Sequence, residues 1–310
     1  MSTVPAATFA LQSQPPVPLP SVPASLPTLG PSEAQLNTAS ILAIALVVFG
    51  AGLLVQRVWL LRGSTAGAPR GRALAVGGIA CLAAGAAAAA WWAQLIDISA
   101  AWTQAWWVMG GTALAIAATV ATVIIDPSKR TADALARVAV GAGSVTAVVG
   151  LAWLGHARTA DPVALSVASD VAHLICAAVW IGGVGVVVAA SVGVGALSGT
   201  AVIELLRRFS ALAAVSVAVL GLTGVTLGIR IAGSLDQLFV GGRGTLLIAK
   251  LVLAWTAVVL AGANGLVFAP KARRSGRWGS VSRTACAELL VLLAVLVVAG
   301  LLSNESPVMN

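Results

Sequence analysis

Charged side chains are scarce in this chain. Asp, Glu, Lys and Arg together make up 9% of its 310 residues, whereas hydrophobic residues make up 59%. Apolar runs of 20 or more residues recur along the sequence, and a soluble core does not need them. A run of about 20 apolar residues spans the hydrocarbon core of a bilayer as a helix. The composition therefore predicts a polytopic membrane protein and excludes an ordinary soluble domain.

Residue types that carry catalysis and metal binding are also rare. The chain has no Tyr, two His and three Cys. Cys81, Cys176 and Cys286 form no CxxC pair, and their different predicted depths exclude a disulfide framework. No HExxH, P-loop or nucleophile elbow is present. We therefore expect no enzymatic activity. An extended Asp/Glu/His proton relay has few residues to use, although a charge exchange between Asp170 and Lys250 stays open.

The apolar runs predict an all-α transmembrane bundle of about eight helices. A β-barrel is excluded because barrel strands alternate in polarity and these runs do not. The predicted spans are 38–61, 73–96, 105–125, 134–155, 164–190, 208–231, 244–268 and 284–302.

The positive charges predict the orientation of the bundle, because cytoplasmic loops retain Lys and Arg. Fourteen basic residues flank the connections after the first, third, fifth and seventh spans, and three flank the other connections. Both termini are therefore expected outside. The net charge of +8 follows from this topology, and we expect no nucleic-acid partner.

Tryptophan should mark the two interfaces of the bilayer, where aromatic belts form. One group falls at predicted outer ends: Trp91, Trp92, Trp102, Trp106, Trp107 and Trp153. Trp59 falls at an inner end. Trp180 and Trp255 fall deeper, so each of them needs a packing or functional reason.

The chain divides into four predicted parts. Residues 1–37 contain eight of the thirteen prolines and no basic residue, which indicates a disordered extracellular tail. Residues 38–130 form a membrane extension of three helices, residues 131–303 a membrane domain of five helices, and residues 304–310 a short tail. The first span is expected to direct membrane insertion and to remain in the protein.

One stretch, DVAHLICAAVWIGG at 170–183, places polar residues inside a predicted span. At about 100° per residue, Asp170 and Cys176 each lie about 60° from His173, and Trp180 returns to within about 20° of it. An ionisable group in a span costs roughly 2.5–3.5 kcal/mol and normally faces the protein interior with a partner. His173 is therefore a functional candidate. The alternative is that it only hydrogen-bonds Asp170 or a neighbouring helix.

Other soft metal ligands are predicted on the same outer side. His156 ends the fourth span, and Met109 lies near the outer end of the third. Together with His173 and Cys176 they offer imidazole, thiol and thioether groups, which suit copper and especially Cu(I). Hard cations would need several carboxylates. Ordinary packing is the alternative reading for Met109 and for the cysteines.

Two residues of the seventh span fit a transport route. Lys250 lies about a third of the way into the span and needs a partner, such as Asp170 or Asp236, unless its ammonium reaches the interface. Asn264, near the inner end, is positioned to hydrogen-bond across helices, and a purely structural role is its alternative.

Several segments resemble one known family. Residues 173–183, HLICAAVWIGG, resemble the signature helix of the CopD copper resistance membrane proteins, where His precedes small apolar residues and Trp-x-Gly-Gly. Residues 207–232 resemble that family's next helix, with Arg-Phe-Ser at the entry and a central Thr-Gly pair. Residues 243–264 resemble the following helix, with a Leu-Leu-x-x-Lys run that ends at Asn. LGHA at 154–157 is also found in family members. The resemblance covers roughly 150–302.

The resemblance implies a plasma-membrane protein of copper uptake or tolerance, with His173 and Trp180 at matched positions. The chain departs from the family in Gly241-Gly242-Arg243, where an aromatic residue is expected, and in its few methionines. We expect copper to be captured in the outer half and moved across the bilayer, with a soluble extracytoplasmic copper carrier as a candidate partner. Two alternatives stay open: a b-type cytochrome with haem between His156 and His173, and a scaffold without transport.

Overall fold

The computed structural model describes residues 31–61, 68–96, 99–125, 129–154, 162–191, 199–232 and 241–304. Within these ranges every regular element is a helix. The helices are α1 (Glu33–Leu60), α2 (Ala68–Ile96), α3 (Ser99–Ile124), α4 (Arg130–Leu154), α5 (Val163–Ser191), α6 (Gly199–Ala232), α7 (Gly241–Ala263), the π-helical segment η4 (Asn264–Phe268), α8 (Ala269–Ser275) and α9 (Gly279–Leu302).

Eight of the described helices are long and apolar enough to cross a membrane. The predicted all-α transmembrane bundle is therefore confirmed. Most helices begin earlier than the apolar runs because polar residues extend them. α1 shows how: Ser32 and Gln35 form a capping box that starts the helix at Glu33, ahead of the first apolar residues.

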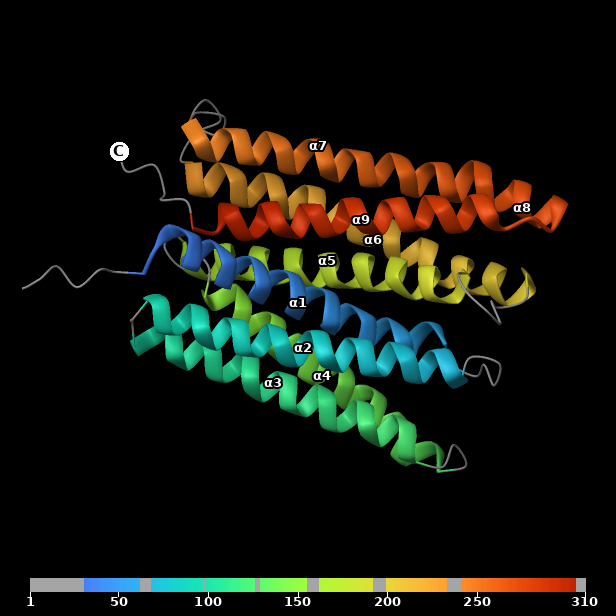
Figure 1. Ribbon diagram of the computed structural model, residues 1–310, viewed down its shortest axis with the longest axis horizontal. Coiled ribbons are helices and arrows are strands. Elements are labelled where there is room, and N and C mark those ends of the chain that lie inside the picture. The colour runs from blue at the N-terminus through green and yellow to red at the C-terminus, as the bar shows by residue number, and fades with distance from the viewer. Residues whose placement is uncertain are drawn as a thin grey trace, which may run out of the picture.

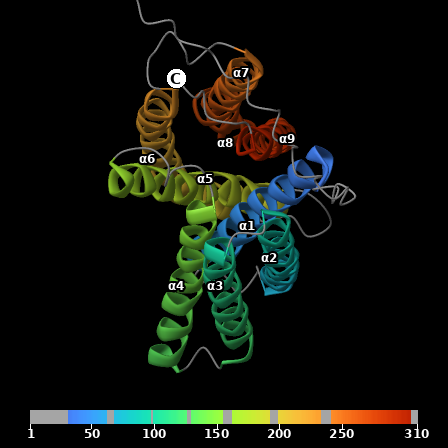
Figure 2. The same cartoon turned by 90° about the vertical axis from the view of Figure 1, so that its left-hand side faces the viewer.

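α1 lies at the centre of the bundle (Figures 1 and 2). It packs against α2 on one side and against α5 and α9 on the other, and it also contacts α4. α3 packs mainly on α4 and α2, α6 packs on α5, and α7 packs on α9. The first predicted helix therefore packs directly against α4, α5 and α9 of the last five. The division of the chain into an extension and a domain stays a prediction.

Glycine allows α1 and α5 to approach closely. A Cβ atom added to Gly182 would overlap the backbone of Gly52, and one added to Gly52 would overlap the carbonyl of Ala178. Next to this seam, Gln56 Nε2 donates to Val179 O at 3.0 Å. The adjacent Gly183 leaves space for the ring of Phe209 on α6. Small residues at such contacts are the usual means by which helices pack closely in a membrane.

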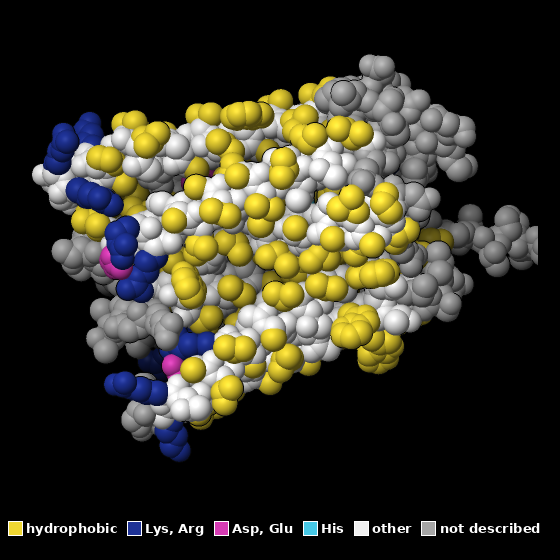
Figure 3. Space-filling view, turned by 180° about the vertical axis from the view of Figure 1, so that it is seen from behind, with side chains coloured by type: hydrophobic (Ala, Val, Ile, Leu, Met, Phe, Trp, Pro, Cys, Tyr) yellow, Lys and Arg dark blue, Asp and Glu magenta, His cyan; other side chains and the backbone are white. Residues whose placement is uncertain are grey.

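The two ends of the bundle differ in charge. Lys and Arg side chains gather at one end, here called the basic end, as Figure 3 shows in dark blue. Both described ends of the chain lie at the opposite end, where Asn304 Nδ2 donates to Asn37 Oδ1 at 2.9 Å and to Ser40 Oγ at 2.7 Å. The separation of charge predicted from the sequence is therefore present along the bundle.

Tryptophan follows the prediction only in part. Trp59, Trp106, Trp107 and Trp153 are exposed near helix ends. The expectation that Trp92 belongs to the interfacial belt is wrong, since it is 2% exposed and packs in the main core. Its helix α2 lies between α1 and α3, and Trp92 turns toward them rather than toward lipid.

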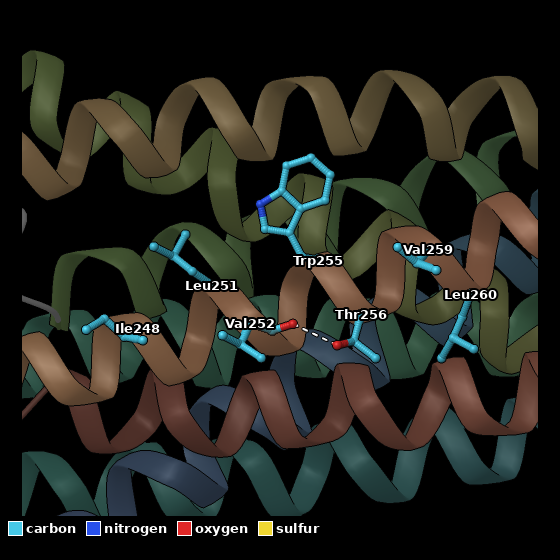
Figure 4. Close-up of a pocket in the computed structure, with 7 residues that line it drawn as sticks. All are labelled: Ile248, Leu251, Val252, Trp255, Thr256, Val259 and Leu260. Carbon is cyan, nitrogen blue, oxygen red and sulfur yellow. Dashed lines mark hydrogen bonds between the residues drawn. The ribbon is translucent and has the colours of Figure 1, made fainter.

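α7 presents one apolar face outward. Ile248, Val252 and Val259 are exposed along it, and Trp255 is 67% exposed. Figure 4 shows Trp255 projecting away from the ribbon of α7, while Thr256 bonds back to the carbonyl of Val252. Packing among the described residues therefore does not explain the deep position predicted for Trp255. Such a face is typical of a helix in contact with lipid.

Candidate functional site

Three helices bring polar side chains to one level of the bundle. His173 lies ten residues into α5 and Lys250 nine residues into α7, while Thr223 lies nine residues before the end of α6. At 1.5 Å per residue, each is about 13–15 Å from the end opposite the basic end. The polar stripe predicted on α5 therefore meets polar residues of α6 and α7.

His173 is held by α6. Its Nδ1 lies 2.9 Å from Thr223 Oγ1, and Thr223 Oγ1 donates to Val219 O at 2.7 Å. In the arrangement where this hydroxyl donates to Val219 O, Thr223 Oγ1 accepts from the Nδ1–H of His173. Nε2 then keeps its lone pair. Gly224 adds space beside the ring, since a Cβ there would lie 3.6 Å from Cε1.

Lys250 and Asp170 place charges around this imidazole. The charges of Asp170 and Lys250 act on one another, and Lys250 also acts on His173. The direct ion pairs of the described residues lie elsewhere, between Asp133 and Arg137 and between Glu204 and two arginines. Asp170 and Lys250 thus lie within electrostatic reach of one another without a direct ion pair. The other predicted partner, Asp236, lies outside the described residues.

Cys176 lies one turn beyond His173 on α5. Its thiol lies beside the hydroxyl of Ser216, a buried residue of α6. His173 and Cys176 both face α6, as their predicted common side requires. The interface therefore contains one imidazole nitrogen with a free lone pair and one thiol, both of which are soft donors.

Trp180 continues the stripe toward the basic end and has a partner that the sequence interpretation missed. Its Nε1 donates to Glu288 Oε1 on α9 at 2.9 Å, and both side chains are buried. The bond explains why this tryptophan lies deep in the bundle. A signal was available in the sequence, because Glu288 is the single carboxylate within the otherwise apolar run 284–302.

The remaining predicted residues do not join this interface within the described structure. Met109 lies on α3, half-buried against the main core, and α3 packs mainly on α4 and α2. His156 lies outside the described residues, so the haem alternative that requires it stays a prediction. Asn264 is buried in η4, and its Oδ1 has no hydrogen-bond partner among the described residues.

The described residues do not form a complete metal cage. They contain no group of three or more His, Cys, Asp or Glu that could hold a metal ion. His173 and Cys176 fit a soft ion in donor type but supply only two ligands. A third donor would have to come from another part of the chain or from the ion's own coordination shell.

Comparisons with known proteins relate part of this chain to copper proteins. The family model of copper resistance protein D matches residues 203–302, which cover most of α6 and all of α7 to α9. The copper transport protein CutJ of Bacillus subtilis (strain 168) is 32% identical over 154 residues. That match takes in 49% of this chain and only 28% of the relative. No solved structure matches the chain significantly. The expected resemblance is thus confirmed, because residues 203–302 of this membrane protein match the family model of copper resistance protein D.

Proposed function

We propose that this protein binds copper in the outer half of the membrane and moves it across the bilayer. The observation that carries the proposal is that the segment matching copper resistance protein D supplies the partners of His173. Thr223 and Lys250 both belong to residues 203–302, and Thr223 fixes the imidazole at 2.9 Å. The similarity to a protein named for copper transport supports the same substrate.

The donor set favours copper in its reduced state. A neutral imidazole with Nε2 free and a thiol one turn away are ligands that Cu(I) prefers, and Cu(I) accepts low coordination numbers. Cys176 binds as the thiolate, so its proton must leave when the metal arrives. We propose His156 as a further ligand, since it ends the fourth predicted span at the same side.

The charges near His173 fit a passing cation better than a permanent one. Lys250 opposes the arrival of a second positive charge, and Asp170 offsets Lys250. A cation held by one neutral imidazole and one thiolate beside an ammonium group is bound less tightly than in a closed structural site. Weak binding of this kind lets an ion leave the site, which transport requires.

Thr223→Val is expected to weaken copper binding by about 10–100-fold, as loss of a residue that orients a histidine ligand usually does. Without the hydroxyl, the hydrogen bond between Nδ1 and Thr223 Oγ1 is lost, so the imidazole is oriented less firmly for binding through Nε2. Purified protein in lipid vesicles should be loaded with Cu(I), and binding and uptake measured for the wild type and the variant.

Thr226→Val is the matched control, because Thr226 also bonds back to its own helix, at 2.9 Å from Leu222 O, but does not contact His173. It should bind copper as the wild type does. Wild-type vesicles that take up no more copper than protein-free vesicles would refute the proposed function.

The orientation proposed here places the basic end in the cytoplasm and both termini outside. A membrane-impermeant thiol reagent, added to intact cells, should label a Ser303→Cys variant and should not label Ser275→Cys. The two positions lie at opposite ends of the bundle, after α9 and at the end of α8. The reverse labelling pattern would place His173 in the inner half and contradict capture from outside. The native cysteines are to be replaced by Ala in both variants.

A further inference from the structure

Glu288 is a carboxyl group in the interior of the membrane domain. It is 3% exposed, lies nine residues into α9 from the basic end, and accepts a 2.9 Å hydrogen bond from Trp180 Nε1. At 1.5 Å per residue it is about 13 Å from that end. An ionised carboxylate at such a depth needs a cation or several donors, because hydrocarbon does not solvate it.

No cation approaches Glu288 within the described structure. α9 packs against α1, α5, α7, η4 and α8. The titratable groups on these elements are Asp170, His173 and Cys176 on α5; Arg243 and Lys250 on α7; Glu33 and Arg57 on α1; Lys271, Arg273 and Arg274 on α8; and Arg283 and Cys286 on α9. None of them forms an ion pair with Glu288. Trp180 is the one hydrogen-bond partner that the structure shows for its side chain.

The surroundings of Glu288 do not suit copper. The indole Nε1–H of Trp180 only donates and has no lone pair for a metal. A lone carboxylate is a hard ligand, and the described residues near it form no group that could hold a metal. A proton is the cation that a single buried carboxylate binds without further ligands.

Asn264 adds a second buried polar group at the same level. Ala272 and Val281 pack together near the basic end. Asn264 lies eight residues before Ala272, and Glu288 seven residues after Val281, so the antiparallel helices bring both to about 10–12 Å from that contact. Asn264 begins η4, which packs on α9, and its buried Oδ1 has no donor in the part of the chain that the structure describes. π-helical segments inside α-helices are frequent at functional sites.

We propose that Glu288 is a proton-binding site, held in place by Trp180, in the half of the bundle nearer the basic end. The carboxylate takes up one proton to become a carboxylic acid and gives it back, while the indole N–H bonds to Oε1 in both states. Its use in transport rests on the proposed copper function: release of a proton from Glu288 would balance the arrival of a copper ion from the other half.

The proton site is tested by infrared difference spectra of the purified protein in lipid, recorded as the pH is changed. The wild type should show a band of a protonated carboxyl group that appears and disappears with pH. Glu288→Gln should lose this band and Trp180→Phe should shift it. Glu204→Gln should keep it, because exposed Glu204 is paired with Arg207 and Arg208.

A Glu288→Gln spectrum that retains the wild-type band, or a Trp180→Phe band at the wild-type position, would overturn the assignment. The amide is close in shape to the acid and keeps an acceptor for Trp180, so folding is expected to survive. In vesicles with a pH gradient, Glu288→Gln should lose the dependence of copper uptake on that gradient. If the wild type takes up copper but shows no carboxyl band that titrates with pH, the proton site alone is refuted. If the wild type takes up no copper, the proposed function is refuted, and the infrared band still tests the proton site.

Discussion

His173→Ala is expected to weaken copper binding by at least about 100-fold and to abolish copper uptake. The substitution removes the imidazole whose Nε2 is left free by the bond between Nδ1 and Thr223 Oγ1 at 2.9 Å. Loss of a residue that orients a metal ligand already lowers metal affinity by about 10–100-fold, and loss of the ligand itself lowers it further. Cys176 alone cannot replace it, since a single thiol holds copper weakly. Binding of Cu(I) to the purified protein and uptake into vesicles measure the two effects separately.

His173→Gln and Leu174→Ala are the matched controls for this result. The glutamine amide can still donate to Thr223, so the α5–α6 contact is preserved while the soft nitrogen is removed. It should therefore fold like the wild type and still fail to bind copper. Leu174→Ala truncates the next residue of α5, which packs against the core, and should retain binding. Wild-type copper uptake by both His173 variants would show that His173 is a structural residue only.

Gly182→Ala is expected to lower the free energy of unfolding by about 3 kcal/mol or more. The new Cβ would overlap the backbone of Gly52, so α1 and α5 would have to separate along their contact. Overpacking of a side chain costs about 1–3 kcal/mol, and here neither helix backbone can turn away as a side chain does. The free energies of unfolding of the variant and the wild type are compared by denaturing both in detergent and monitoring the loss of the helical circular dichroism signal.

Gly77→Ala is the control, because a Cβ at Gly77 meets nothing within 4 Å. Alanine in the middle of a helix is favoured over glycine by roughly 0.5–1 kcal/mol, so this variant should be as stable as the wild type or slightly more so. Gly52→Ala should lower the free energy of unfolding about as much as Gly182→Ala. The double variant should lower it by less than the sum of the two single effects, because both substitutions open the same contact. Equal melting of the Gly182 and Gly77 variants would mean that the α1–α5 contact is not tight.

The stripe on α5 shows how far sequence reasoning reached toward the site. Helical spacing alone placed His173, Cys176 and Trp180 on one side, and in the structure the first two face α6 and the third bonds to α9. The partners were not predictable. Threonine and serine are common in membrane helices. Nothing in the sequence around Thr223 and Ser216 indicates which neighbouring helix they face.

Trp92 and Glu288 show the opposite limit. The position of Trp92 near a helix end predicted an interfacial residue, yet the rotation of α2 against α1 and α3 turns it into the core. The sequence did not single out Glu288 as a site residue, because the run 284–302 is apolar on average and one carboxylate changes that average little. Both residues depend on which side of a helix faces a neighbour, and these long apolar spans have little amphipathic pattern to reveal it.

The sequence by itself determined that this chain forms eight long membrane-spanning helices, that its basic residues collect at one end, and that one helix carries a polar stripe. These properties follow from composition and helical period, which are local, because a bilayer forces each apolar run to satisfy its own backbone hydrogen bonds. Tertiary structure alone decided that α1 lies at the centre, that Thr223 holds His173, and that Trp180 meets Glu288. In a bilayer nearly every side of these helices is apolar, so the shape of small residues such as Gly52 and Gly182, together with a few polar contacts, selects the neighbours.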